Sequence, residues 1–146
     1  MELKNLALIL IISLFLISGF IVSVSAENSY DDKYIDGLNV SFDLDQSLKD
    51  AKLENKTIMI IFDQSSCVYC DMLKENTLTD SKVQEAINEK YIPAIVDINK
   101  NPMIASNYNV YGTPTVVFVS GDEEFVYQID GYLDPEEFLD ELKQIE

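Results

Sequence analysis

The sequence predicts an α/β fold in which a central mixed sheet carries helices on both faces. Short runs rich in Ile, Val and Tyr, bounded by turn residues, alternate with segments whose apolar residues recur at helical spacing. The last two strand candidates, residues 115–119 and 124–129, are separated by a short turn around Gly121, which predicts an antiparallel hairpin. Strands that alternate with helices and then end in a hairpin indicate a sheet with both parallel and antiparallel neighbours.

The first predicted helix and strand precede the two cysteines of the chain. Asp43 is placed to cap a helix that ends near Asn55. Residues 58–62 form an unbroken apolar run, Ile-Met-Ile-Ile-Phe, which predicts a buried strand. The helix that begins at the cysteines is expected to end near residue 75 or 76.

The middle of the chain continues the alternation of helix and strand. Asp80 is placed to cap a helix, and residues 91–98 follow as a strand whose ladder is interrupted at Pro93. Asn101 and Pro102 then form a helix start, with Asn as the cap and Pro at the first helical position.

The final helix has the strongest start signal in the sequence. Asp134 is followed by Pro135 at the first helical position and by Glu137 three residues after the cap, which predicts a reciprocal capping box. Phe138 and Leu142 recur at helical spacing after this start, so we expect them to face the core.

Composition limits the kinds of partner that the protein can have. The 146 residues are enough for one domain, and they include 26 acidic residues against 10 Lys, for a net charge of −16. Nucleic acids and anionic membrane surfaces are bound through cationic contacts, so this balance argues against both. The sequence contains no His and no Arg, so the usual general base is absent, as is the commonest metal ligand.

The N-terminal 26 residues have the pattern of a secretory signal peptide. Lys4 precedes an apolar stretch, and the small residues Val24, Ser25 and Ala26 form a cleavage site before Glu27. An uncleaved membrane anchor is the alternative, because the apolar residues 6–24 are long enough to span a bilayer. Both interpretations place the rest of the chain outside the cytoplasm.

The remainder divides into a linker and one domain. Residues 27–41 are polar and acidic, and we interpret them as a linker that ends in a short edge strand near residues 38–42. Residues 42–146 are predicted to form the folded domain, whose size is sufficient to bury a core without further cross-links.

Cys67 and Cys70 are the only two cysteines, and they lie where the strand at residues 58–62 gives way to a helix. The start of a helix has unpaired backbone N–H groups and about half a positive charge, so a thiol there loses its proton more easily. Three residues later, the second cysteine lies on the same helix face, close enough to form a disulfide. Such a pair can store and release two electrons.

Two other interpretations of the pair remain open. Zinc uses the C-x-x-C spacing but needs four ligands, and without His or further Cys a two-thiolate Cu(I) site is the better metal hypothesis. A purely structural disulfide would close a very short loop and contribute little stability, because the entropic gain grows with loop length.

A second motif makes the redox interpretation stronger. Gly112, Thr113, Pro114 and Thr115 precede a predicted strand, some 40 residues after the cysteines. Together with the Asn-Pro helix start, this motif resembles the thioredoxin superfamily over about residues 42–144. The branch it resembles comprises exported proteins, including the soluble thiol domain of the transmembrane electron-transporter family.

This resemblance implies a three-layer fold and a role for several residues. Cys67 would attack a substrate and Cys70 would resolve the mixed disulfide, while Pro114 would follow a cis peptide bond and face the pair. Tyr69 and Thr113 would line a substrate groove together with Pro114. No cofactor beyond the disulfide is implied, and the expected partners of the monomer are protein thiols or disulfides and a membrane electron donor.

The chain also departs from thioredoxin around the cysteines. Ile61 stands where the family has a buried Asp, and Ile95 stands where it has the accompanying Lys. Asp63 is the candidate proton acceptor in their place, although it can equally be a turn residue. Asp63 and Asp71 oppose a thiolate, so we expect a reductase, while an oxidase, an isomerase or a redox-inactive binding module remain alternatives.

Overall fold

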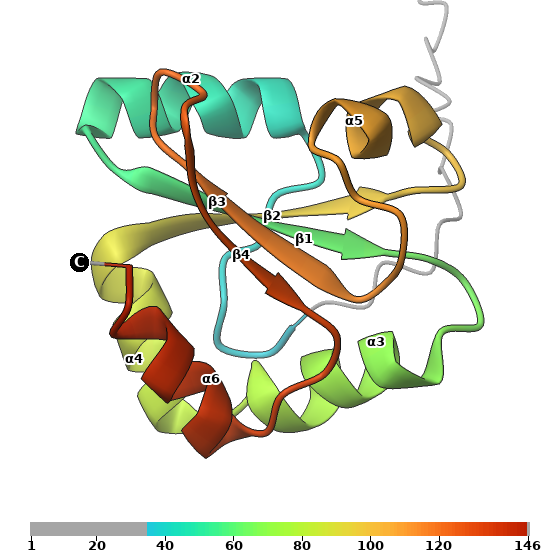
Figure 1. Ribbon diagram of the computed structural model, residues 1–146. Helices are drawn as coiled ribbons and strands as arrows, with labels where there is room; N and C mark the ends of the chain where they lie inside the picture. Colours follow the sequence, from blue (N-terminus) through green and yellow to red (C-terminus); the bar gives the residue numbers. More distant parts are fainter. Residues whose placement is uncertain (1–34, 146) are drawn as a thin grey trace, which may run out of the picture. The chain divides into compact units, whose positions relative to one another are not determined.

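The computed structural model describes residues 35–145, which form a four-stranded mixed sheet with strand order β2-β1-β3-β4 (Figure 1). The central strand β1 (Thr57–Asp63) pairs in parallel with β2 (Tyr91–Asp97) and antiparallel with β3 (Thr115–Val119). Strand β4 (Phe125–Asp130) completes the predicted hairpin with β3. The predicted mixed sheet is therefore confirmed.

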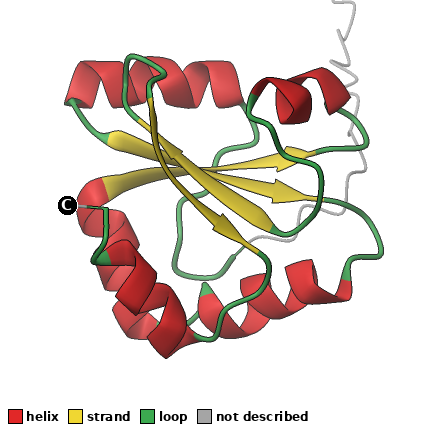
Figure 2. Ribbon diagram, in the orientation of Figure 1, coloured by secondary structure: helices red, strands yellow, loops and turns green. Residues whose placement is uncertain are grey.

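Helices cover both faces of this sheet, which gives three layers (Figure 2). Helices α2 (Leu44–Glu54) and α5 (Pro102–Asn107) lie on one face. The other face carries α3 (Val68–Met72), the π-helical turn η1 (Leu73–Thr77), α4 (Ser81–Lys90) and α6 (Pro135–Leu142).

The apolar run of β1 serves the two cores at once. Met59 and Ile61 belong to the cluster under α4 and α6, whereas Ile58, Ile60 and Phe62 belong to the cluster under α2 and α5. Successive side chains of a strand point to opposite faces, so a central strand covered on both sides must be apolar at every position. This arrangement holds the end of β1, where the cysteines follow, in a fixed position.

Carboxylate caps begin three of the helices as predicted. Asp43 accepts a hydrogen bond from the N–H of Gln46 at 2.9 Å, and Asp80 caps α4 in the same way. Asp134 and Glu137 form the complete capping box of α6. Such caps satisfy N–H groups that have no partner within the helix.

The predicted helix start at Asn101 and Pro102 and the predicted extent of the helix after the cysteines are confirmed, with a difference of detail in each. Asn101 occupies the N-cap position of α5, but its side chain donates to the carbonyl of Asp97 at 3.2 Å and accepts no bond from the helix. The helix after the cysteines extends to Thr77, because its last turn widens into η1, where the N–H of Leu78 bonds the carbonyl of Leu73 at 2.9 Å. Such π turns are rare and occur mostly near functional sites.

The folded unit begins before residue 42. Ile35 and Leu38 are almost fully buried in the core cluster under α4 and α6, so the end of the predicted linker belongs to the domain. The expected edge strand near residues 38–42 is reduced to one parallel bridge between Ser41 and Ala94. The predicted signal or anchor, residues 1–26, lies outside the described residues, and within residues 35–145 no helix is long and apolar enough to cross a membrane.

Candidate redox site

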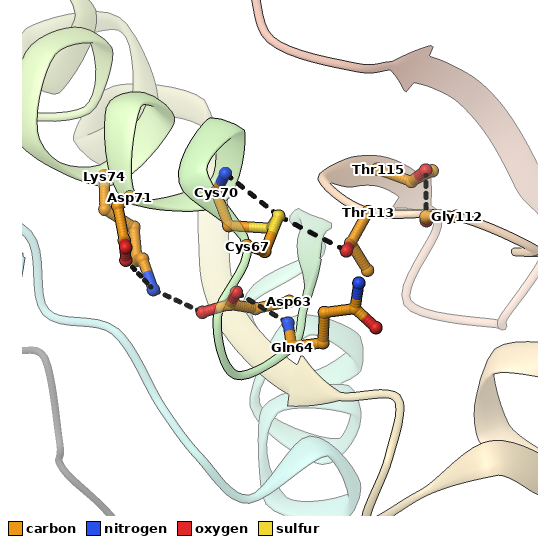
Figure 3. The surroundings of a disulfide bond; sticks show 9 residues. All are labelled: Asp63, Gln64, Cys67, Cys70, Asp71, Lys74, Gly112, Thr113 and Thr115. Carbon is orange, nitrogen blue, oxygen red and sulfur yellow. Dashed lines mark hydrogen bonds and ion pairs between the residues drawn. A yellow bond between two sulfur atoms is a disulfide. The ribbon is translucent and has the colours of Figure 1, made fainter.

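Cys67 and Cys70 form a disulfide at the start of α3, immediately beyond the carboxyl end of β1 (Figure 3). Their Cα atoms are 5.2 Å apart. The connecting turn includes Ser66 at φ +64°, which reverses the chain so that Cys67 becomes the N-cap residue of the helix. The pair is therefore positioned by a rigid strand on one side and a helix start on the other.

The two sulfur atoms have different surroundings. Cys67 Sγ accepts a hydrogen bond from the backbone N–H of Cys70 at 3.1 Å, as a capping group does. Cys67 is 9% exposed, whereas Cys70 is 2% exposed. A hydrogen bond to the charged form of an acid favours that form, so this contact stabilises a thiolate on Cys67 once the disulfide is reduced.

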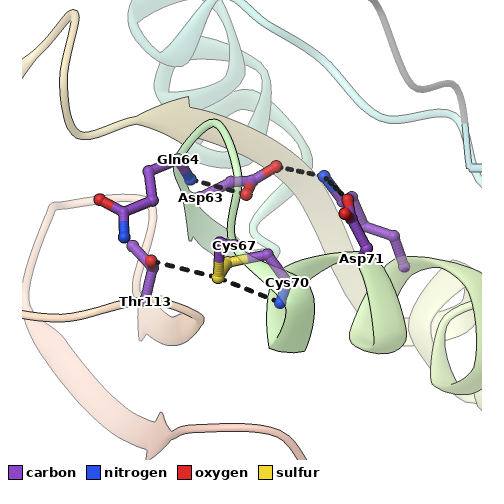
Figure 4. Close-up of polar contacts among 7 residues, drawn as sticks. Asp63, Gln64, Cys67, Cys70, Asp71 and Thr113 are labelled. Carbon is purple, nitrogen blue, oxygen red and sulfur yellow. Dashed lines mark hydrogen bonds and ion pairs between the residues drawn. A yellow bond between two sulfur atoms is a disulfide. The ribbon is translucent and has the colours of Figure 1, made fainter.

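The loop before β3 brings the second predicted motif to the disulfide. The hydroxyl of Thr113 lies 3.4 Å from Cys67 Sγ (Figure 4). The Thr113–Pro114 peptide bond is cis. The carbonyl of Pro114 accepts the N–H of Gly131 at 2.9 Å, which ties this loop to the end of β4. The hydroxyl of Thr113 thus lies beside the pair, and the cis peptide bond directly follows this residue.

The exposed ring of Tyr69 and the partly buried ring of Tyr132 form the border on the helix side. Tyr69, between the two cysteines, is 61% exposed, and its ring stacks on that of Tyr132 with centroids 6.5 Å apart. Val68 is 69% exposed next to it. The predicted groove residue Tyr69 therefore presents an apolar surface to solvent directly beside the sulfur atoms.

Asp63 is the last residue of β1 and lies beside the disulfide in both close-up views (Figures 3 and 4). It belongs to the strand and is 4% exposed, so the alternative interpretation of Asp63 as a turn residue is wrong. Its carboxylate accepts hydrogen bonds from the N–H of Gln64 at 2.6 Å and from the ammonium of Lys74 at 2.5 Å.

Lys74 is the cation nearest the cysteines in the sequence, but its pairing with Asp63 was not predicted. Its side chain is 10% exposed and also lies 3.5 Å from the carboxylate of Asp71. The thioredoxin pattern places a cation on the neighbouring strand, where this chain has the buried Ile95. The signal was the spacing of Cys70 and Lys74, because residues four apart share one face of a helix.

Within residues 35–145 no group of three or more Cys, Asp or Glu is arranged to hold a metal ion. The two sulfur atoms and the neighbouring ion pair instead form an arrangement suited to the exchange of protons and electrons.

The chain belongs to the thioredoxin-like domain family, whose sequence model matches residues 44–146. A thioredoxin from Thermus thermophilus has the same fold, with a TM-score of 0.68 and 28% identity over 75% of this chain and 87% of that one. The oxidised C-terminal domain of DsbD from Neisseria meningitidis also superimposes, with a TM-score of 0.61 and 21% identity over 70% and 93% of the two chains.

Among curated proteins, the chain resembles the thiol:disulfide interchange protein DsbD. It is 28% identical to DsbD of Campylobacter jejuni over 102 residues and 25% identical to that of Colwellia psychrerythraea over 108 residues. The matched segments cover 68% and 70% of this chain, but the chain spans only 18% of the length of each relative. The fold, the cysteine pair and these relatives together support a thiol–disulfide oxidoreductase that resembles the thiol domain of DsbD.

Proposed function

We propose that this protein is an extracytoplasmic thiol–disulfide oxidoreductase that works as a reductase through Cys67 and Cys70. The observation that carries the proposal is the position of Cys67 Sγ, held between the N–H of Cys70 at 3.1 Å and the hydroxyl of Thr113 at 3.4 Å. The apolar leader at residues 1–26 supports the location outside the cytoplasm.

The reaction proceeds in two exchange steps. In the reduced protein, the thiolate of Cys67 attacks one sulfur of a substrate disulfide, so that a Cys67–substrate bond forms while the substrate disulfide breaks and releases a thiolate. Cys70 then loses its proton and attacks Cys67 Sγ, which forms the internal disulfide and releases the second substrate thiolate. Two electrons pass from the protein to the substrate.

Each sulfur has the surroundings that its step requires. Cys67 is the more exposed sulfur and receives the backbone hydrogen bond, so it attacks first. Cys70 is buried and must lose a proton inside the protein. The buried carboxylate of Asp63 beside the pair is the acceptor we assign to that proton.

Charge around the pair supports the reducing direction. A strong oxidant needs a thiolate that is stabilised by nearby cations. The cation beside this pair, Lys74, is already neutralised by Asp63 and Asp71, and the sequence has no Arg or His. The disulfide is therefore the favoured state, and reduction of substrates requires electrons from a membrane donor.

The pair itself is the only redox centre that this mechanism uses, and the protein acts as a monomer on thiols and disulfides of other proteins. Equilibration with thiol buffers tests the direction. We expect a potential close to that of thioredoxin, about −270 mV. Half reduction by weakly reducing glutathione mixtures, at about −120 to −180 mV, would contradict the reductase assignment.

A further inference from the structure

We propose that the pocket beside Thr113 and Pro114 selects substrate segments in which a Lys or Arg lies next to the reacting cysteine. Asp130, at the end of β4, is the group that binds this cation. The inference rests on the proposed function, because it names the class of protein segment that the same site accepts.

Thr113 belongs both to the lining of this pocket and to the surroundings of the reactive sulfur. The pocket is lined by the loop at Tyr111, Thr113 and Pro114 on one side and by the end of β4, with Gln128 and Asp130, on the other. The hydroxyl of Thr113 is 3.4 Å from Cys67 Sγ. A segment bound through its cysteine at Cys67 therefore places a neighbouring side chain at the pocket, because adjacent residues of an extended chain are only about 3.3 Å apart.

Asp130 gives this pocket the chemistry of a cation site. Its carboxylate accepts a hydrogen bond from the side-chain amide of Gln128 at 2.8 Å. The hydroxyl of Thr115, which also contacts the carbonyl of Gly112 at 3.0 Å, lies 3.4 Å from the same carboxylate. Both groups are neutral, so they orient the carboxylate without neutralising it. Among the described residues that line the pocket, Asp130 is the only charged one.

The ring of Tyr111 adds a second attraction for a cationic side chain. Tyr111 lines the pocket and is 87% exposed, and the face of a tyrosine ring attracts a cation. Asp71, next to Cys70, has a side chain that is 45% exposed on the other side of the disulfide. With a net charge of −16, the protein attracts basic segments toward this face and repels acidic ones.

Exchange rates of three matched peptides test the proposal. Each has one central cysteine, joined as a disulfide to a small neutral thiol, and is flanked on both sides by Lys, by Gln or by Glu. Rates with the reduced protein are divided by rates with dithiothreitol, which removes differences in the intrinsic reactivity of the peptides. We expect the Lys peptide to react about tenfold faster than the Glu peptide at low salt, and the ratio to shrink as salt is raised.

An isosteric variant with a matched control separates the pocket from overall charge. Asp130→Asn should lower the preference for the Lys peptide over the Gln peptide about threefold, the size of one exposed ion pair. Asp122→Asn makes the same change in net charge at the opposite end of the hairpin, where Asp122 pairs with Lys52, and should leave the preference unchanged.

The outcomes distinguish the two proposals. Equal normalised rates for the three peptides, or equal effects of the two variants, would overturn the selection by Asp130 while leaving the oxidoreductase function intact. Absence of exchange with all three peptides would overturn the function and, with it, this inference.

Discussion

Two ion pairs of similar length occupy opposite regions of the molecule and have opposite environments. Lys74 and Asp63 lie 2.5 Å apart beside the disulfide, with side chains that are 10% and 6% exposed. Lys52 and Asp122 lie 2.9 Å apart between α2 and the β3–β4 turn, with side chains that are 70% and 73% exposed. From this difference we expect burial, rather than distance, to decide how much each pair contributes to stability.

Removal of one partner alone is expected to destabilise the fold much more at the buried pair than at the surface pair. Water solvates the surface pair whether or not its partner is there, so its loss costs little. The interior cannot solvate Asp63 in this way, and removal of its partner leaves an uncompensated charge. The same burial holds Asp63 against Lys74 beside the disulfide, the position from which its proposed role as proton acceptor would be exercised.

The largest effect is predicted for Lys74→Met, which retains an apolar chain but removes the buried cation. We expect the free energy of unfolding of the oxidised protein to fall by about 3–5 kcal/mol in urea denaturation. The double variant Asp63→Asn/Lys74→Met should recover much of this loss, because it removes both charges. A loss below about 1 kcal/mol for Lys74→Met would place this pair in the same category as the surface pair.

The next effect concerns the proton of Cys70. Asp63→Asn should slow the resolution of a mixed disulfide about a hundredfold, the usual contribution of a positioned base, while the attack by Cys67 changes much less. Stopped-flow measurement of the two steps, each as a function of pH, separates this role from simple destabilisation. Equal slowing of both steps would show that Asp63 only supports the structure.

A third carboxylate is expected to contribute a stabilisation between those of the two ion pairs. Asp134 is exposed, but it accepts two backbone N–H groups of α6, from Glu136 at 3.0 Å and Glu137 at 2.9 Å. Asp134→Ala should therefore lower the free energy of unfolding by about 1 kcal/mol. Thermal or urea unfolding measures this change, and a loss as large as that of Lys74→Met would contradict the importance of burial.

The smallest effect is predicted for the surface pair itself. Asp122→Asn should change the free energy of unfolding by less than about 1 kcal/mol, and the difference should decrease further in high salt. A double-mutant cycle with Lys52→Met measures the coupling of the two side chains directly. A coupling energy above about 2 kcal/mol would mean that this exposed contact is far stronger than its environment allows.

The sequence was informative wherever the signal was local. The caps at Asp43, Asp80 and Asp134 could be predicted because a carboxylate and the N–H groups it accepts lie within three residues of each other. The buried run of β1 and the position of Cys67 at the helix start follow from the same kind of short-range pattern.

Features that depend on tertiary contacts could not be predicted in the same way. The ion pair joins Asp63 and Lys74 across the disulfide loop, and it exists only because the helix turns Lys74 inward toward the end of β1. Ile35 and Leu38 are buried because α4 and α6 leave space for them, which no pattern within an acidic segment indicates. Asn101 has a residue type that commonly caps helices, but its side chain donates to the carbonyl of Asp97 instead.

The most direct test of the central claim is to trap the two cysteines in turn with a disulfide-containing protein substrate. Reduced Cys70→Ser should accumulate a mixed disulfide that mass spectrometry assigns to Cys67, because the resolving thiol is missing. Reduced Cys67→Ser should neither accumulate such a species at Cys70, which is 2% exposed, nor turn over the substrate. Retained turnover by Cys67→Ser, or a mixed disulfide that forms preferentially on Cys70, would contradict the account.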